Sequence, residues 1–232
     1  MTANPIQGKV DARGITRLCH ITRSMTLPFI VEMGEIVATS RLDQDELAIY
    51  YPNDHMRLDG HKTHVSCSVQ YPNAWYLKLV QAREPLFKDW IVLLIEPDPL
   101  WWSNTLFCPV NAATEHGRYI AEGKDGFDAM FENFTPTGRI GRGLTHLASC
   151  PTDNQAEVLV LDGIPLDLVR CVVVRDEAQA KRERWKLSEF GLSVPELGLA
   201  ICPEFFDPRA LAGRIASSVE TDPSCGSFWG GR

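Results

Sequence analysis

A glutamine and a glutamate stand together at the start of a predicted strand, in the segment Gln155-Ala156-Glu157. Residues at positions i and i+2 of a strand lie on the same face, so these two polar side chains project together. The apolar run 158–161 follows at once and predicts a buried strand. A carboxylate beside an amide could bind ribose hydroxyls, stabilise a positive centre or accept a proton. A glutamate exposed at a sheet edge is the alternative interpretation.

A second polar face is predicted over residues 64–71, where apolar and polar residues alternate. The polar positions, which share one face, are His64, Ser66, Ser68 and Gln70. A strand with one apolar and one polar face suits a ligand cleft over a sheet, although a half-exposed edge strand has the same pattern. No GxSxG motif is present and neither serine has a base nearby in the sequence, so a hydrolase triad is unsupported.

Histidines and cysteines give no metal signature. His20 lies among apolar residues, a setting more typical of a hydrogen-bonded core histidine than of a site residue. The six histidines form no HxH or HxxxH pair, and the seven cysteines form no CxxC pair. We therefore predict neither a metal site nor a disulfide framework.

The composition is that of a globular protein, with 232 residues of which 44% are hydrophobic and 23% charged. This balance excludes disordered and fibrous chains. The net charge of −7 argues against an extended duplex-DNA surface but leaves a local basic groove open. The longest apolar run, residues 90–95, is too short to span a bilayer, and the first residues lack a signal-peptide core. We expect a soluble cytoplasmic protein.

The elements that would position these residues are short. Strands are predicted near residues 15–22, 35–38, 64–71, 90–95, 156–161 and 168–174, with a turn at Ile164-Pro165, and helices near 25–33, 74–83, 125–132, 176–186 and 208–219. The segments 39–63 and 103–154 are predicted to be long loops, and the tail 223–232 to be mobile. Strands and helices do not alternate regularly and no glycine-rich phosphate motif is present. The pattern favours an α+β fold on a curved or split sheet.

Four blocks, in this order and spacing, resemble the DarT family, which comprises ADP-ribosyltransferase toxins that modify nucleobases. The blocks are CHIT at 19–22, RLDGH at 57–61, SCSVQYPN at 66–73 and PTDNQAEVLV at 151–160. The resemblance covers residues 15–175 and implies a single domain, with residues 176–232 as a C-terminal extension. It also implies an ADP-ribosyltransferase-like split β-sheet with flanking helices that clamps NAD. NAD would be consumed as a substrate, so neither a dinucleotide-binding motif nor a metal is required.

The resemblance assigns roles to matching residues. Glu157 matches the catalytic glutamate, and Arg57 matches an arginine in the loop over the cofactor that can pair with the pyrophosphate or a reacting group. On the NAD side the expected residues are His20, Thr22, Ser66, Ser68 and Gln155. These roles agree with the physical interpretation, because cleavage of the nicotinamide–ribose bond develops positive charge that a nearby carboxylate stabilises.

The loop 137–143 is basic and glycine-rich, and its Arg139 and Arg142 could hold phosphates or stack on a base. A surface loop with two solvated arginines is an equal alternative. The compact RLDGH segment resembles the guanine-modifying or CmdT-like branch more closely than the thymidine-modifying one. The expected partners are single-stranded DNA or RNA and a neutralising antitoxin in a toxin–antitoxin or phage-defence system. A protein-directed ADP-ribosyltransferase, or an inactive binding module on the same fold, is the alternative.

Overall fold

The structure, a computed structural model, describes residues 4–42, 59–194 and 196–229. The strands are β1 (Leu18–Arg23), β2 (Glu35–Val37), β3 (His64–Val69), β4 (Trp90–Ile95), β5 (Leu106–Cys108), β6 (Ala121–Glu122), β7 (Glu157–Leu161), β8 (Gly163–Pro165), β9 (Val169–Val174), β10 (Gly198–Ile201) and β11 (Gly226–Ser227). The α-helices are α1 (Pro5–Arg13), α2 (Leu27–Met33), α4 (Ala74–Arg83), α5 (Gly123–Ala129), α6 (Glu177–Glu189) and α7 (Pro208–Ala216).

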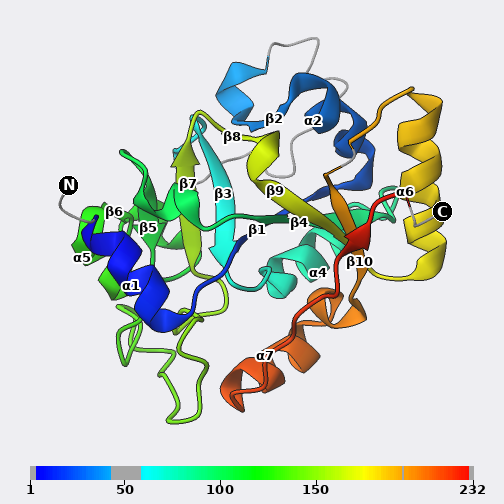
Figure 1. The fold of residues 1–232 in the computed structure, drawn as a ribbon. Helices are drawn as coiled ribbons and strands as arrows, with labels where there is room; N and C mark the ends of the chain where they lie inside the picture. Colours follow the sequence, from blue (N-terminus) through cyan, green and yellow to red (C-terminus); the bar gives the residue numbers. More distant parts are fainter. Residues whose placement is uncertain (1–3, 43–58, 195, 230–232) are drawn as a thin grey trace.

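One large sheet runs through the centre of the molecule, and helices flank it (Figure 1). Within the described residues it has nine strands in the order β11-β10-β9-β4-β1-β3-β7-β5-β6, while β2 and β8 form a separate pair. Its neighbours pair antiparallel except β9 and β10, which are parallel. This architecture confirms the predicted α+β class.

The sheet opens between β1 and β3. β1 pairs with β4 along all six of its residues, from Leu18 to Arg23. It pairs with β3 only at its first two residues, Leu18 and Cys19. Beyond this point β3 pairs with β7 instead. The split therefore begins at His20 of β1, a residue that the sequence analysis expected on the NAD side.

Both faces of the central strands are buried, which explains why residues 90–95 are apolar throughout. Alternate residues of β4 belong to two different hydrophobic clusters. One cluster joins the sheet to α1, α2, α5 and α6, and the other joins it to α4 and α7. Helices thus cover the two faces of the sheet, as expected for strands that are apolar on both sides.

Several helix ends follow from single residues. Asn73 caps α4 by accepting from the Tyr76 amide at 2.9 Å, and the predicted helix 74–83 is confirmed at both ends. Asp207 caps α7 ahead of Pro208, as predicted. Ser24, expected to cap the helix 25–33, does not do so. Its hydroxyl donates to Glu183 on α6, 2.6 Å away, and a 3₁₀ turn over Ser24–Thr26 precedes α2.

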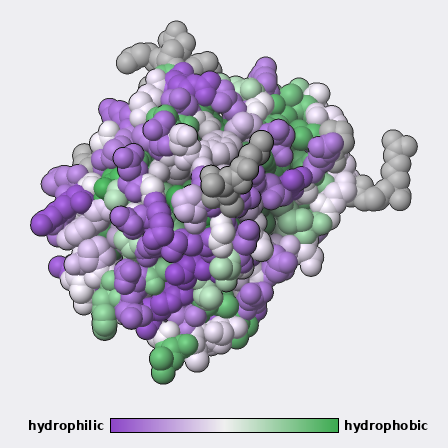
Figure 2. Space-filling view, turned by 60° about the vertical axis from the view of Figure 1, so that its left-hand side comes forward, coloured by the Kyte–Doolittle hydropathy of each residue, from purple (hydrophilic) through white to green (hydrophobic). Residues whose placement is uncertain are grey.

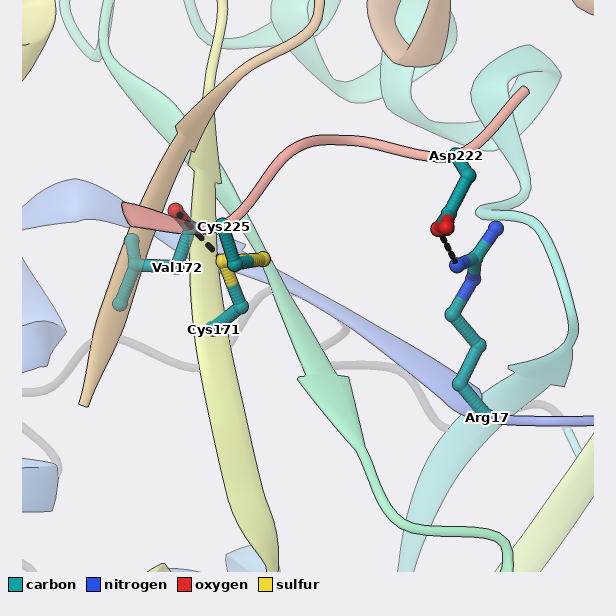
Figure 3. Close-up of a disulfide and its surroundings, with 5 residues drawn as sticks. All are labelled: Arg17, Cys171, Val172, Asp222 and Cys225. Atoms are coloured by element: carbon teal, nitrogen blue, oxygen red, sulfur yellow. Dashed lines mark hydrogen bonds and ion pairs between the residues drawn. A yellow bond between two sulfur atoms is a disulfide. The ribbon is translucent and has the colours of Figure 1, made fainter. Parts of the chain in front are cut away.

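The C-terminal segment differs most from the sequence-based expectation. Residues 226–227 pair with β10, and a disulfide joins Cys225 to Cys171 on β9 (Figure 3). Asp222 forms an ion pair with Arg17 at 2.6 Å in the same view. For residues 223–229 the prediction of a mobile tail is therefore wrong, and the cysteine spacing, which supported no disulfide framework, did not reveal this bond. The two cysteines are 54 residues apart, and only the finished sheet brings them together.

Two further elements were not predicted as observed. Asn4 caps an N-terminal helix, α1, which packs against α5 at one end of the sheet (Figure 1). Ile164-Pro165, predicted as a turn, belongs to strand β8, because this segment pairs with β2.

On the face shown in Figure 2 hydrophilic residues cover most of the surface. None of the described helices has the length and apolar character needed to cross a membrane.

Candidate active site

A cavity of about 760 Å³ lies at the split in the sheet. Its lining residues come from β1, β3 and the start of β7, from α2, β2 and α4, and from the loop segments 110–114 and 137–140. Pockets of this size are typical of sites for small molecules and cofactors. The cavity places the polar face of β3 beside the first residue of β7, as the sequence predicted.

Glu157 is held at the start of β7 by three donors. The Ser66 hydroxyl donates to Oε2 at 2.5 Å, and the Asn111 amide and the Ala112 backbone N–H donate to Oε1 at 2.8 and 2.9 Å. Asn111 and Ala112 follow β5, which pairs with β7 at Cys108 and Glu157. The pairing therefore brings the loop donors onto the carboxylate. A carboxylate held in this way is preorganised to face developing positive charge.

His20 spans the split at the point where β1 leaves β3. Its Nδ1 lies 2.9 Å from the Ser66 backbone oxygen. A carbonyl only accepts hydrogen bonds, so Nδ1 carries the proton and donates it. In the neutral ring Nε2 is then the acceptor nitrogen. Ser66 thus contacts both predicted residues, His20 through its carbonyl and Glu157 through its hydroxyl.

All five residues predicted on the NAD side line this cavity; they are His20, Thr22, Ser66, Ser68 and Gln155. The hydroxyls of Thr22 and Thr26 lie 2.9 Å apart, and Ser68 donates to the Cys19 carbonyl at 3.4 Å. The structure brings these residues together with Glu157, and their roles toward NAD stay predictions. Arg57 lies outside the described residues.

The two arginines of the loop 137–143 are used differently. Arg139 is exposed and lines the cavity. Arg142 is half-buried, and its guanidinium donates to the carbonyls of Cys150 at 2.8 Å and Leu147 at 2.6 Å. Its guanidinium therefore holds the loop together, and its expected role in binding nucleic acid stays a prediction. Only Arg139 is carried into the proposal below.

The cysteines around the site are not nucleophiles. Cys67 and Cys108 are buried next to the carboxylate-bearing strand. Burial raises the pKa of the Cys108 thiol to about 11 and raises that of Cys67 still more strongly. A thiol with such a pKa stays protonated and unreactive. Glu157 is consequently the group suited to charge stabilisation.

Among the polar residues of the cavity that sequence reasoning missed are Asn111 and Asp153. Asn111 lies in a segment predicted to be irregular, and only the β5–β7 pairing shows its contact with Glu157. Asp153 carried a usable signal, since it lies two residues before Gln155 and four before Glu157 in the same polar alternation. In the described part of the chain no cluster of three metal-binding side chains is found.

The site thus combines a carboxylate fixed by three donors among the described residues with a cavity large enough for a nucleotide, at the split in the sheet. The family comparison makes this more specific. Residues 19–206 match the family model described as "ssDNA thymidine ADP-ribosyltransferase, DarT". The chain belongs to the DarT family and is an NAD-dependent ADP-ribosyltransferase for which NAD is the substrate.

The fold is shared with solved structures of low sequence identity. DarT of Thermus sp. 2.9 in complex with ADP-ribosylated ssDNA superposes with a TM-score of 0.56 at 13% identity, over 83% of this chain and 97% of that one. The same protein in complex with carba-NAD+ gives 0.53 at 14%, over 82% and 97%. Thermosipho africanus DarTG in complex with ADP-ribose gives 0.56 at 15%, over 82% and 51%. No curated protein matches the sequence.

Proposed function

We propose that the protein transfers ADP-ribose from NAD to a nucleobase of single-stranded DNA. The observation that carries the proposal is the carboxylate of Glu157, fixed by Ser66, Asn111 and Ala112 inside the cavity at the split. When the bond between nicotinamide and ribose breaks, positive charge develops on the ribose. A fixed negative charge stabilises this transition state without reorganising, which is a large source of catalysis.

In this proposal the strands also orient NAD. His20 presents its acceptor nitrogen, and the hydroxyls of Ser66 and Ser68 lie along the same lining. Groups that fix the ribose relative to the attacking base replace a bimolecular encounter by an oriented one. The Ser66 hydroxyl contacts Glu157, so a ribose hydroxyl bound here would lie beside the catalytic carboxylate.

The acceptor would approach from the rim that carries Arg139. This side chain is exposed at the cavity, whereas the chain as a whole has a net charge of −7. Few phosphates would then be contacted, and affinity for DNA would be modest and sensitive to salt. A base in a duplex must first be extruded at a cost of a few kcal/mol, which favours single-stranded DNA.

The RLDGH sequence at residues 57–61 resembles the guanine-modifying branch, which favours guanine as the acceptor base. The matching family model, in contrast, is described as a thymidine ADP-ribosyltransferase.

We further propose that a neutralising antitoxin accompanies the protein. This is supported by the family and by the DarTG neighbour, whose chain is about twice the length that this one covers. A toxin that modifies DNA in its own cell requires such a partner.

Incubation with labelled NAD and, separately, single-stranded DNA, duplex DNA, RNA and cell lysate tests the acceptor class. We expect label on single-stranded DNA, with the duplex modified more slowly. Label on RNA alone would move the acceptor to messenger RNA and contradict the DNA assignment. Label found only on lysate proteins would replace the proposal by protein-directed ADP-ribosylation.

A further inference from the structure

Asp153 is a second carboxylate in the cavity, and the chemistry described above does not use it. Only 6% of the residue is exposed, yet it borders the cavity. One carboxylate oxygen, Oδ1, accepts from the Gln155 backbone N–H at 2.8 Å. In the part of the chain that the structure describes, the other oxygen, Oδ2, accepts no hydrogen bond, and it is not among the fully buried atoms. A ligand in the cavity can therefore reach this oxygen.

Asp153 and Glu157 lie close to the same point of the fold. Both carboxylates line the same cavity, and Glu157 pairs with Cys108 of β5. Their surroundings nevertheless differ. Among the described residues three donors contact the Glu157 carboxylate and one contacts that of Asp153, and burial raises the pKa of Asp153 above its usual range. Two carboxylates in contrasting environments typically divide the tasks of charge stabilisation and proton transfer.

We propose that Asp153 is the acceptor-side base, an inference that depends on the proposed transfer to a nucleobase. Its Oδ2 accepts a hydrogen bond from the N–H of the base that is modified. As this nitrogen bonds to C1 of the nicotinamide ribose, the bond between C1 and nicotinamide breaks and its electron pair leaves with neutral nicotinamide. The proton of the base nitrogen passes to Asp153, which later releases it to water.

The division of work follows from the hydrogen bonds. Both oxygens of Glu157 already accept bonds, and its negative charge is needed opposite the ribose during bond cleavage. Asp153 has an oxygen to offer, and a raised pKa makes a carboxylate a better proton acceptor near neutral pH. The loop that leads into Asp153 also carries Arg139, the exposed arginine of the acceptor rim.

The substitution Asp153→Asn tests this role, because asparagine keeps an oxygen for the Gln155 N–H while losing the basic carboxylate. We expect transfer to a single-stranded oligonucleotide to fall by at least about tenfold, since a positioned base contributes roughly 10²- to 10⁴-fold. NAD affinity, measured by calorimetry, should change by less than about twofold, as Asp153 contacts the acceptor rather than NAD. Asp167→Asn, at an exposed position outside the cavity lining, is the matched control.

The outcomes separate this inference from the proposed function. If the unchanged protein labels the oligonucleotide and Asp153→Asn labels it as fast, the role of Asp153 is wrong while the function stands. A parallel loss of transfer and NAD affinity, or a lowered melting temperature that accounts for the loss, also overturns it. If the unchanged protein labels no DNA, the proposed function fails and this inference fails with it. Lost transfer with intact NAD binding and melting supports it.

Discussion

The two walls of the cavity are built differently. On one wall His20, Ser66 and Glu157 lie on strands of the central sheet and are joined by hydrogen bonds of 2.5 to 2.9 Å. On the other wall residues 137–140 belong to a loop, where Arg139 is exposed and Ile140 is 37% exposed. The residues proposed to act on NAD, which need a fixed geometry, thus lie on paired strands, whereas the residue proposed to contact DNA lies on a loop.

This contrast predicts which changes affect the reaction and which affect only the acceptor. A strand-wall substitution should impair every reaction of NAD, whatever the acceptor. A loop-wall substitution should weaken the use of DNA while sparing NAD binding. Changes distant from both walls should alter stability alone.

The largest effect is expected for Glu157→Gln. Glutamine keeps the shape and much of the hydrogen bonding but removes the negative charge, so transfer should fall by about a hundredfold or more. Transfer is measured as labelled oligonucleotide formed per minute by protein with unchanged melting behaviour. Glu122→Gln, at an exposed position on β6, is the control. Retained transfer in Glu157→Gln would remove this residue from the catalytic role.

His20→Ala should have the next largest effect. It removes the ring that bridges the split and the predicted contact with NAD, so NAD affinity should fall by about tenfold, the equivalent of one hydrogen bond. Combined with Glu157→Gln, its effect on transfer should be much less than additive, because both act in one step. Unchanged NAD affinity by calorimetry, together with normal turnover, would leave His20 a structural residue.

The two loop arginines give a matched pair with a smaller effect. Arg139→Ala should weaken oligonucleotide binding and lower the salt slope by about one unit, as expected when one phosphate contact is lost. Arg142→Ala should instead lower the unfolding free energy, by about 1–3 kcal/mol, because the carbonyls of Cys150 and Leu147 each lose the hydrogen bond from its guanidinium, and Leu147 keeps only the Cys150 N–H. DNA titrations at several salt concentrations and thermal melts distinguish them. If Arg139→Ala lowered the stability and Arg142→Ala weakened DNA binding, the roles given to the two side chains would be wrong.

The smallest effect on transfer is expected at the C-terminal tail. The double change Cys171→Ser and Cys225→Ser opens a loop closed across 54 residues and should lower the unfolding free energy by up to about 4 kcal/mol. Cys171 and Cys225 do not line the cavity, so transfer at 25 °C should stay within about twofold. A large loss of transfer with a modest change in melting temperature would show that the tail acts on the site.

Helix-capping residues and the spacing of apolar residues correctly predicted the elements whose limits depend on neighbouring residues in the sequence. Asp207 and Pro208 predicted the start of α7, Pro72-Asn73 marked the end of the strand before α4, and the apolar run 90–95 is the fully buried strand β4. The alternation over residues 64–71 identified the polar face of β3. In these segments capping and periodicity agree with the tertiary structure, so the sequence alone was sufficient.

Features that depend on distant pairing could not be predicted. Asn111 reaches Glu157 only because β5 pairs with β7, and Cys225 meets Cys171 only because the tail joins β10 beside β9. Arg139 and Arg142 have similar neighbours in the sequence, yet the carbonyls that engage Arg142 come from residues 147 and 150 of the folded loop. Such contacts require the whole fold.

The central claim is that the Glu157 cavity attaches ADP-ribose to a base of single-stranded DNA. The direct test is to treat a single-stranded oligonucleotide with the protein and NAD, digest it to nucleosides and determine their masses. We predict one deoxynucleoside that carries ADP-ribose, with guanine as the expected base, formed by the unchanged protein and not by Glu157→Gln. Unmodified nucleosides, or equal modification by the two proteins, would contradict the account.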